Sequence, residues 1–123
     1  MKSIIVFNNN NEQKNIINSV EYADTYTKRL TGLMGKKTFK GMLFKQQRRE
    51  KIFSIIHTSF MKVPIDIIYI NNNMKVIEKT MLKPWKIHIP KHNNIKYILE
   101  LPEEYSKLYN IELKDKIVIK DEQ

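Results

Sequence analysis

A chain of 123 residues that is 41% hydrophobic and 28% charged is long enough to bury one core, and this composition excludes a disordered chain. It contains no cysteine, which excludes disulfides, thiolate catalysis and zinc sites built on cysteine. The net charge of +9 is uneven, because residues 1–62 hold 12 Lys and Arg but only 4 Asp and Glu.

The basic N-terminal half has two interpretations. A surplus of cations attracts phosphates, nucleic acid or an anionic surface. However, only 3 of the 22 basic residues are arginine, whose planar guanidinium is favoured for base recognition. Lysine, isoleucine and asparagine, all abundant here, also share A/T-rich codons, so codon bias alone would give this composition. We therefore expect solvated lysines and keep nucleic-acid binding as an alternative.

The first half of the chain predicts short strands and one helix. Apolar patterning indicates strands over residues 3–7, 16–22, 42–44 and 52–56, the last two flanking a basic loop. After Asp24 or Thr25 as a cap, helical apolar spacing predicts a helix over residues 26–34 that ends at Gly35. The three glycines Gly32, Gly35 and Gly41 indicate either close backbone approach and positive φ or simple breaks between elements.

The second half begins with residues 65–70, whose nearly continuous apolar run predicts a central strand buried on both faces. Asparagines 71–73 then predict a hairpin to a strand over 74–81. A long connection over 83–94 leads to a strand over 95–101. Pro102 fits the first turn of a helix, in which Tyr105, Leu108 and Tyr109 would form one core-facing stripe. Residues 116–120 predict the last strand.

These elements predict a mostly β fold. We expect a single compact domain over residues 1–123, a jelly-roll-like sandwich or partly closed barrel with one or two short helices. The apolar run at residues 3–7 is too short for a signal sequence or a membrane span. We therefore expect a cytoplasmic protein with no membrane partner.

Asp66 is the most informative polar residue, because it stands in a strand otherwise made of isoleucine and tyrosine. A buried carboxylate must be hydrogen-bonded, paired or protonated. As a functional group it would be a general base or a ligand contact. As a structural group it would accept backbone N–H bonds or pair with Lys62 or Arg29. Both interpretations stay open.

Lys62 and Glu100 are two further charged candidates for the site of Asp66. Lys62 is four residues away, but Pro64 between them excludes a helical pair, so the two side chains would flank one bend. Lys62 would there bind an anion or be an ordinary surface lysine. Glu100, at the end of a predicted strand, offers a second carboxylate at a distance from Asp66 that sequence does not fix.

The remaining motifs are weak. His57, His88 and His92 suggest a metal site, but Pro90 argues against a helix that would align the last two. There is no HExxH, GxSxG or glycine-rich phosphate loop, so we expect no metal and no cofactor. Trp85, the only tryptophan, either stacks on a planar ligand or closes the edge of a core, and we expect the second.

An ordered set of short segments carries a family resemblance. In chain order the segments are Ala23-Asp24-Thr25, Arg29, Gly32-Leu33-Met34-Gly35, Gly41-Met42-Leu43-Phe44, Phe60-Met61-Lys62, Pro64-Ile65-Asp66-Ile67-Ile68-Tyr69-Ile70, Lys83-Pro84-Trp85 and Tyr97-Ile98-Leu99-Glu100-Leu101-Pro102. Over about residues 20–119 the chain resembles the family catalogued as domain of unknown function 192. Many bacterial members have Trp-Met-Lys-Asn-Thr before Pro-Leu-Asp. This chain has only Lys62 and Val63 between Met61 and Pro64, which is similar to archaeal members.

The resemblance implies a β-rich, jelly-roll-like domain and no established catalytic activity. The positions that match the family pattern and would line a pocket are Arg29, Met61, Lys62, Asp66 and Glu100. We therefore expect a small binding module with a cleft near residues 60–66 for a small or anionic ligand or a peptide. The alternatives are a cofactor-free hydrolase or isomerase with Asp66 as base, and a weak nucleic-acid binder. Oligomeric state stays open.

Overall fold

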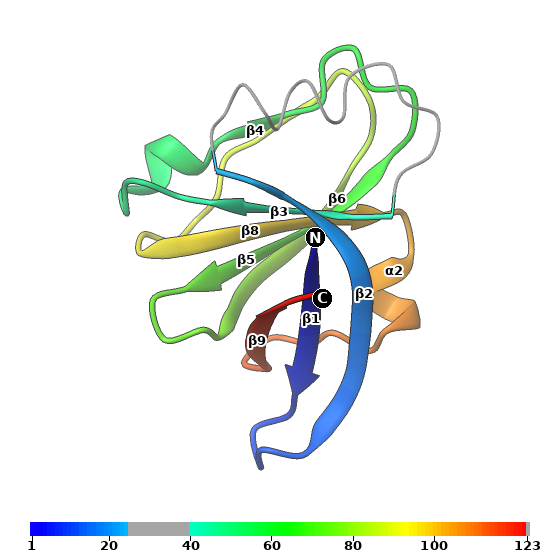
Figure 1. Cartoon of the computed structure of the whole chain (residues 1–123). Helices are drawn as coiled ribbons and strands as arrows, with labels where there is room; N and C mark the ends of the chain where they lie inside the picture. Colours follow the sequence, from blue (N-terminus) through cyan, green and yellow to red (C-terminus); the bar gives the residue numbers. More distant parts are fainter. Residues whose placement is uncertain (25–39, 123) are drawn as a thin grey trace.

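A seven-stranded sheet forms most of the fold in the computed structural model, which describes residues 1–24 and 40–122. Its strand order is β6-β5-β8-β3-β2-β1-β9, and a separate two-stranded ribbon pairs β4 with β7 (Figure 1). The elements are β1 (Lys2–Phe7), β2 (Gln13–Ala23), β3 (Met42–Lys45), the 3-10 helix η1 (Lys51–Ser54), β4 (Ile56–His57), β5 (Ile65–Asn71), β6 (Val76–Leu82), β7 (Ile87–His88), β8 (Ile95–Pro102), α2 (Tyr105–Leu108) and β9 (Lys116–Asp121).

Strand β5 is buried along its length between β6 and β8, which confirms the predicted central strand. Its side chains alternate between the faces of the sheet, because successive residues of a strand point in opposite directions. Ile68 and Ile70 enter a first core, whereas Ile67 and Tyr69 enter a second. One apolar strand therefore requires covering layers on both sides.

The first core is enclosed by the sheet itself. Its buried members come from β1, β2, β3, β5, β6, β8 and β9, and they are joined by Ile111 from the loop after α2. The second core lies against the ribbon, and Ile56 of β4 and Met61 beyond it pack there with β5 and β8. The result is a compact, sandwich-like arrangement of the kind that the sequence predicts.

The two edge strands of the sheet meet at one end. The Val76 amide donates to the carbonyl of Asp115 (2.9 Å), and the Ile117 amide donates to the carbonyl of Met74 (2.8 Å). A single bridge also joins Lys75 to Lys116. Because this pairing is confined to one end, the described strands curl into a sandwich without closing into a barrel.

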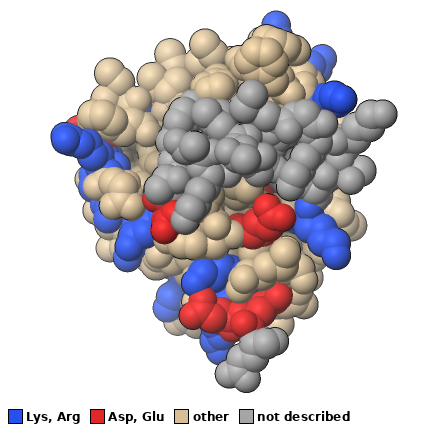
Figure 2. All heavy atoms as spheres, turned by 45° about the horizontal axis from the view of Figure 1, so that its top comes forward, with Lys and Arg blue, Asp and Glu red and all other residues tan. Residues whose placement is uncertain are grey.

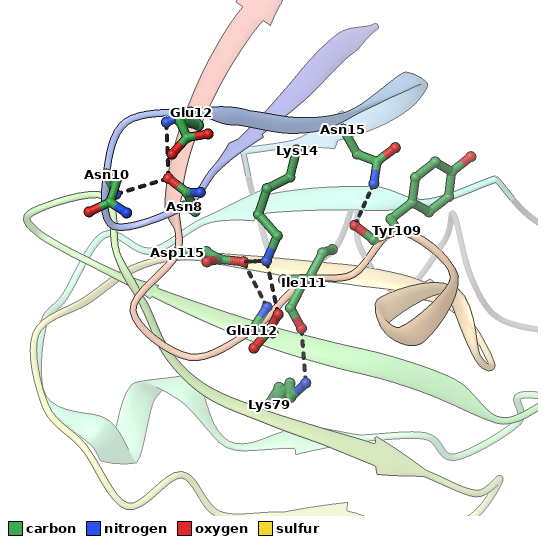
Figure 3. Close-up of polar contacts among 10 residues, drawn as sticks. All are labelled: Asn8, Asn10, Glu12, Lys14, Asn15, Lys79, Tyr109, Ile111, Glu112 and Asp115. Atoms are coloured by element: carbon green, nitrogen blue, oxygen red, sulfur yellow. Dashed lines mark hydrogen bonds and ion pairs between the residues drawn. The ribbon is translucent and has the colours of Figure 1, made fainter.

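A polar network holds the loop that follows α2 (Figure 3). Lys14 on β2 places its Nζ 2.7 Å from Asp115 Oδ2 and 3.2 Å from Glu112 Oε1. Asn15 donates to the carbonyl of Tyr109, and Lys79 on β6 donates to the carbonyl of Ile111, both at 2.9 Å. Burial would lower the pKa of Lys14, but its two carboxylate partners outweigh burial and raise this pKa. The network thus connects β2 and β6 through one loop.

The predicted strand over residues 52–56 is wrong. The chain forms η1 there and then only the two-residue β4. The buried Gln46 donates from its Nε2 to the carbonyl of Phe53 (2.6 Å), and the Phe53 amide donates to Glu50. Hydrogen bonds from the Gln46 side chain and within the local backbone therefore replace strand pairing in this segment. The side chains of Ile52 and Phe53 remain exposed.

The helix expected to begin at Pro102 also differs. Pro102 ends β8, and α2 begins at Tyr105 and makes a single turn. Tyr105 and Tyr109 pack on the first core as predicted, but Leu108 is 70% exposed, because so short a helix covers little of the core. The helix predicted over residues 26–34, with Gly32 and Gly35, lies outside the described residues.

Gly41 confirms the prediction of positive φ and close approach. Its φ is 139°, and a Cβ at this position would lie 3.0 Å from Cδ2 of Leu101. Its carbonyl accepts the amide of Glu21, where β2 comes alongside β3 (3.0 Å). A larger residue would push β3 away from the first core.

Lys14→Met is expected to lower the free energy of unfolding by about 1–3 kcal/mol, because it leaves the buried Asp115 carboxylate without its cation. Urea unfolding followed by circular dichroism measures the loss. Lys120→Met, at an exposed lysine of β9, is the matched control and should change stability by less than about 0.5 kcal/mol. Equal effects of the two substitutions would contradict a structural role of the network.

Candidate functional site

Asp66 holds α2 against the sheet. Its residue is 5% exposed, and its Oδ2 accepts the backbone amide of Ser106 at 2.9 Å. Ser106 lies in the single turn of α2, whose described contacts with the strands are to β5 and β8. The bond confirms the interpretation in which Asp66 accepts a backbone N–H. It also accounts for a carboxylate in an otherwise apolar strand.

The strand register places Asp66 and Glu100 on opposite faces of the sheet. Asp66 pairs across the β5–β8 ladder with Leu101, which belongs to the first core. Glu100 pairs with Ile67, which belongs to the second core, and Glu100 is fully buried. Because paired residues share a face, the sheet separates the two carboxylates. They cannot act as one catalytic pair.

The other predicted positions are also dispersed. Met61 is buried in the second core, and Lys62 is exposed on the bend before β5. Arg29 lies outside the described residues. The structure thus brings none of Met61, Lys62, Asp66 and Glu100 into a shared pocket, and a contact of any of them with a ligand stays a prediction.

A hollow of about 680 Å³ lies between β3, η1 and β4. The described residues that line it are Asp24, Phe44, Lys45, Gln46, Gln47, Arg48, Ile52, Phe53, Ile55 and His57. Gln46 fixes its shape, because the side chain bonds the backbone of η1 from within the fold. The 3-10 turn η1, which the sequence patterning assigned to a strand, therefore forms a wall of this hollow.

The lining combines apolar walls with cations. Phe44, Phe53 and Ile55 present carbon surface, and Lys45 and Arg48 add positive charge. The Arg48 guanidinium lies 5.1 Å from the centre of the Phe53 ring, which is a cation–π contact. None of the five positions singled out in the sequence is among the described lining residues. The basic loop between the strands predicted over residues 42–44 and 52–56 was the only signal for this site in the sequence.

A second feature is the far end of the β4–β7 ribbon, where Thr58 joins two turns. The fully buried Thr58 accepts the amides of Met61 (3.1 Å) and Trp85 (3.0 Å) at its carbonyl. Its Oγ1 donates to the carbonyl of Lys83 (2.6 Å) and accepts the amide of Lys86 (3.0 Å). One residue, through its carbonyl and its hydroxyl together, thus fixes residues 58–61 against residues 83–86.

These turns hold two aromatic rings outside the core. The ring centres of Phe60 and Trp85 are 4.7 Å apart with a 58° angle between the planes. Trp85 is 63% exposed, so the expectation that it closes a core edge is wrong. Its left-handed backbone (φ 62°) and the bond to Thr58 turn the indole outward instead.

Glu78 on β6 holds the connection that contains His88 and His92. Its carboxylate lies 2.8 Å from His88 Nε2 and 3.0 Å from His92 Nδ1, and it accepts the Lys91 amide at 2.9 Å. Since a carboxylate only accepts, each imidazole nitrogen carries the proton. Burial alone would raise the pKa of Glu78, but these hydrogen bonds outweigh burial and lower this pKa below 4.5.

The third histidine is not part of this group. His57 pairs with Ile87 in the ribbon, whereas His88 pairs with Ile56, so the two histidines point to opposite faces of the ribbon. Over residues 1–24 and 40–122, no group of three or more His, Asp or Glu side chains, the Glu78 group included, has an arrangement that could hold a metal ion. The same part of the chain contains no helix long and apolar enough to cross a membrane.

The family model DUF192, "Uncharacterized ACR, COG1430", matches residues 5–119. The chain is 38% identical over 109 residues to the UPF0127 protein PH1112 of Pyrococcus horikoshii, a match covering 87% of this chain and 94% of the relative. It is 35% identical over 104 residues to the UPF0127 protein PF1050 of Pyrococcus furiosus, covering 85% and 89%. The chain therefore belongs to the DUF192 family, with archaeal relatives.

Solved structures share the fold. A putative transcription regulator of Sinorhizobium meliloti superposes with a TM-score of 0.81 at 18% identity, covering 95% of this chain and 92% of that protein. A protein of unknown function from Novosphingobium aromaticivorans gives 0.77 at 16% identity, covering 94% and 83%. At these identities the likeness shows the fold alone.

Asp66→Ala is expected to lower the free energy of unfolding by about 1–2 kcal/mol, because the half-buried Ser106 amide loses its acceptor. Asp66→Asn keeps an amide oxygen that accepts the same N–H, so it should cost clearly less. Urea unfolding of both variants measures the difference. Equal losses would show that the hydrogen bond is not what Asp66 contributes.

The Glu78 contacts predict an acid-sensitive stability. A lowered carboxyl pKa stabilises the fold fully above the unfolded-state value of 4.5, and this part is lost as pH falls through the lower folded-state pKa. Glu78→Gln should therefore cost about 1 kcal/mol or more at neutral pH and distinctly less near about pH 3. Unfolding curves at both pH values test this. Glu103→Gln, at an exposed site, is the control, and a pH-independent cost of Glu78→Gln would contradict the assignment.

Proposed function

We propose that the protein is a small-molecule binding module whose ligand occupies the hollow between β3, η1 and β4. The observation that carries this proposal is the combination of apolar walls and cations in one hollow of about 680 Å³. Ligand sites of small molecules have this size and are mostly apolar with a few placed polar groups. The ligand class that fits is an amphipathic molecule with an apolar body and an anionic group.

The charges around the hollow support an anion. Lys45 and Arg48 supply two cations, and Asp24 is the one acidic residue among the described lining residues. Arg48 already lies over the Phe53 ring, where its guanidinium can meet a carboxylate while the ring contacts the apolar body. The net charge of +9 adds long-range attraction for an anion.

The proposal keeps the expected function class and moves the site. The sequence placed the cleft near residues 60–66, whereas the hollow involves His57 and the residues before it. The shift follows from burial, since Met61 and Asp66 are enclosed within the fold and Asp66 is bonded to Ser106. Lys62, which is exposed, is the one described member of the predicted set that a ligand could reach without rearrangement.

Decanoate is a suitable probe, and decanol is its uncharged match. Titration calorimetry should show decanoate binding, with a rise in melting temperature as its concentration exceeds Kd. Arg48→Gln should weaken decanoate about tenfold or more, since it removes a charge-assisted contact, and Phe53→Ala should weaken it by removing apolar surface. Decanol should bind more weakly than decanoate to the unchanged protein.

Lys51→Gln is the matched control, because this exposed cation lies three residues from Arg48 and is not among the described lining residues. It should leave the decanoate affinity within about twofold. No decanoate binding at millimolar concentration, or equal affinities for the protein and its Arg48→Gln and Phe53→Ala variants, would refute the proposed site.

A further inference from the structure

We propose that the end of the β4–β7 ribbon is a docking surface for an anionic lipid bilayer. This aromatic tip consists of Phe60, Trp85 and Ile87 together with Lys62, Lys83 and Lys86. It is separate from the hollow and makes contact with a membrane surface without any membrane-spanning segment. The expectation of no membrane partner came from the absence of a long apolar stretch, which a peripheral contact does not need.

The tip is unusually apolar for exposed surface. Phe60, Trp85 and Ile87 are 57%, 63% and 66% exposed. Of the twelve exposed large apolar side chains among the described residues, four fall in the short segments 56–62 and 83–89 that contain β4, β7 and the two turns: Phe60, Trp85, Ile87 and Ile89. Apolar residues gathered in this way mark a contact surface rather than chance exposure.

The backbone conformation of the tip holds the two aromatic side chains in their exposed positions. Phe60 and Trp85 have φ of 64° and 62°, a left-handed conformation that is rare for bulky residues. Thr58 bonds both turns at once and thereby holds the two rings beside each other. A glycine or asparagine would adopt these angles at lower cost, so the aromatic side chains are not explained by the turns themselves.

The charge of the same segments has one sign. Residues 56–62 and 83–89 contain three lysines and no aspartate or glutamate. Lys62, Lys83 and Lys86 are exposed beside the two rings. Glu78, on β6 before the second segment, has its carboxylate occupied by His88, His92 and the Lys91 amide. Figure 2 shows mostly uncharged side chains along the upper rim of the face turned to the viewer, with Lys and Arg side chains at its margins, and most of the acidic side chains in view lie lower.

This chemistry favours an anionic bilayer over nucleic acid. Tryptophan and phenylalanine settle at the boundary between headgroups and acyl chains, and lysines reach from there to the phosphates. The rings are tilted by 58° against each other, so they do not form the parallel slot that would hold a base. The tip also has lysines and no arginine, which suits attraction to a charged surface better than recognition of bases.

Trp85 is the only tryptophan, so its fluorescence reports on the tip directly. The experiment titrates the protein with vesicles of phosphatidylcholine alone and with vesicles containing a third phosphatidylglycerol. With the anionic vesicles we expect a blue shift of the emission, quenching by brominated acyl chains and co-sedimentation of the protein. Neutral vesicles should bind far more weakly, and added salt should release the protein.

Substitutions separate the contribution of the lysine charges to membrane binding from the contribution of the aromatic side chains. Lys83→Gln with Lys86→Gln should lower the partition coefficient for anionic vesicles about thirtyfold, since each lysine near the surface contributes about a factor of five. Phe60→Ala should lower it as well. Leu108→Ala, at an exposed apolar residue of α2, and Lys107→Gln beside it are matched controls and should leave partitioning unchanged. Circular dichroism establishes that each variant is folded.

Several results would overturn the proposal. One is an emission spectrum that does not shift with anionic vesicles, and another is equal partitioning into neutral and anionic vesicles. A shift produced by single-stranded oligonucleotides at lower concentration than by lipid would assign the tip to nucleic acid instead. A shift that follows protein concentration alone would assign it to self-association. Trp85→Ala should leave decanoate binding unchanged, so this test and the test of the hollow fail independently.

Discussion

The burial of β5 on both faces is the constraint on which the rest of the structure depends. A strand of Ile65, Ile67, Ile68, Tyr69 and Ile70 has no side that water can wet, so each face of the sheet must be covered. On one face the sheet curls so that β1, β2 and β9 cover it, and α2 and the loop after it add to the cover. On the other face the cover is the ribbon β4–β7 with the chain around it.

The two covers differ in how they are held. The first is made of longer strands paired along most of their length, with two irregularities in the β1–β2 register, and the Lys14 network supplements this pairing. The second has strands of only two residues, so few of its backbone groups are satisfied by pairing. Buried or nearly buried side chains bond the backbone there instead, with Gln46 holding η1, Thr58 the turn over residues 83–86 and Glu78 the connection to β8. In the second cover, hydrogen bonds from polar side chains thus take the place of the strand pairing that holds the first cover.

This division explains which features could be predicted from the sequence. The strands of the sheet show apolar periodicity or continuous apolar runs, and these gave β1, β2, β3, β5, β6, β8 and β9 close to their positions. Residues 52–56 are equally apolar but form η1 and β4, because long-range bonds from Gln46 and the pairing with β7 decide their shape. Trp85 was misplaced for the same reason, since its direction depends on Thr58, 27 positions earlier. The faces on which Asp66 and Glu100 lie follow from the β5–β8 register. The sequence does not determine this register, and a shift by one residue would move a side chain to the other face.

The second cover is also where the proposed binding surfaces lie, and its construction gives a reason. A layer held by individual polar side chains needs less apolar area for its own stability than a packed strand does. Phe53, Phe60 and Trp85 are therefore available at its outer side while Ile56 and Met61 seal the core beneath. His57, the last residue of β4, lines the hollow, and the next residue, Thr58, holds the aromatic tip, so two consecutive residues serve the two surfaces. The sheet thus serves as the base, and the residues of both proposed surfaces belong mostly to the layer that covers its second face.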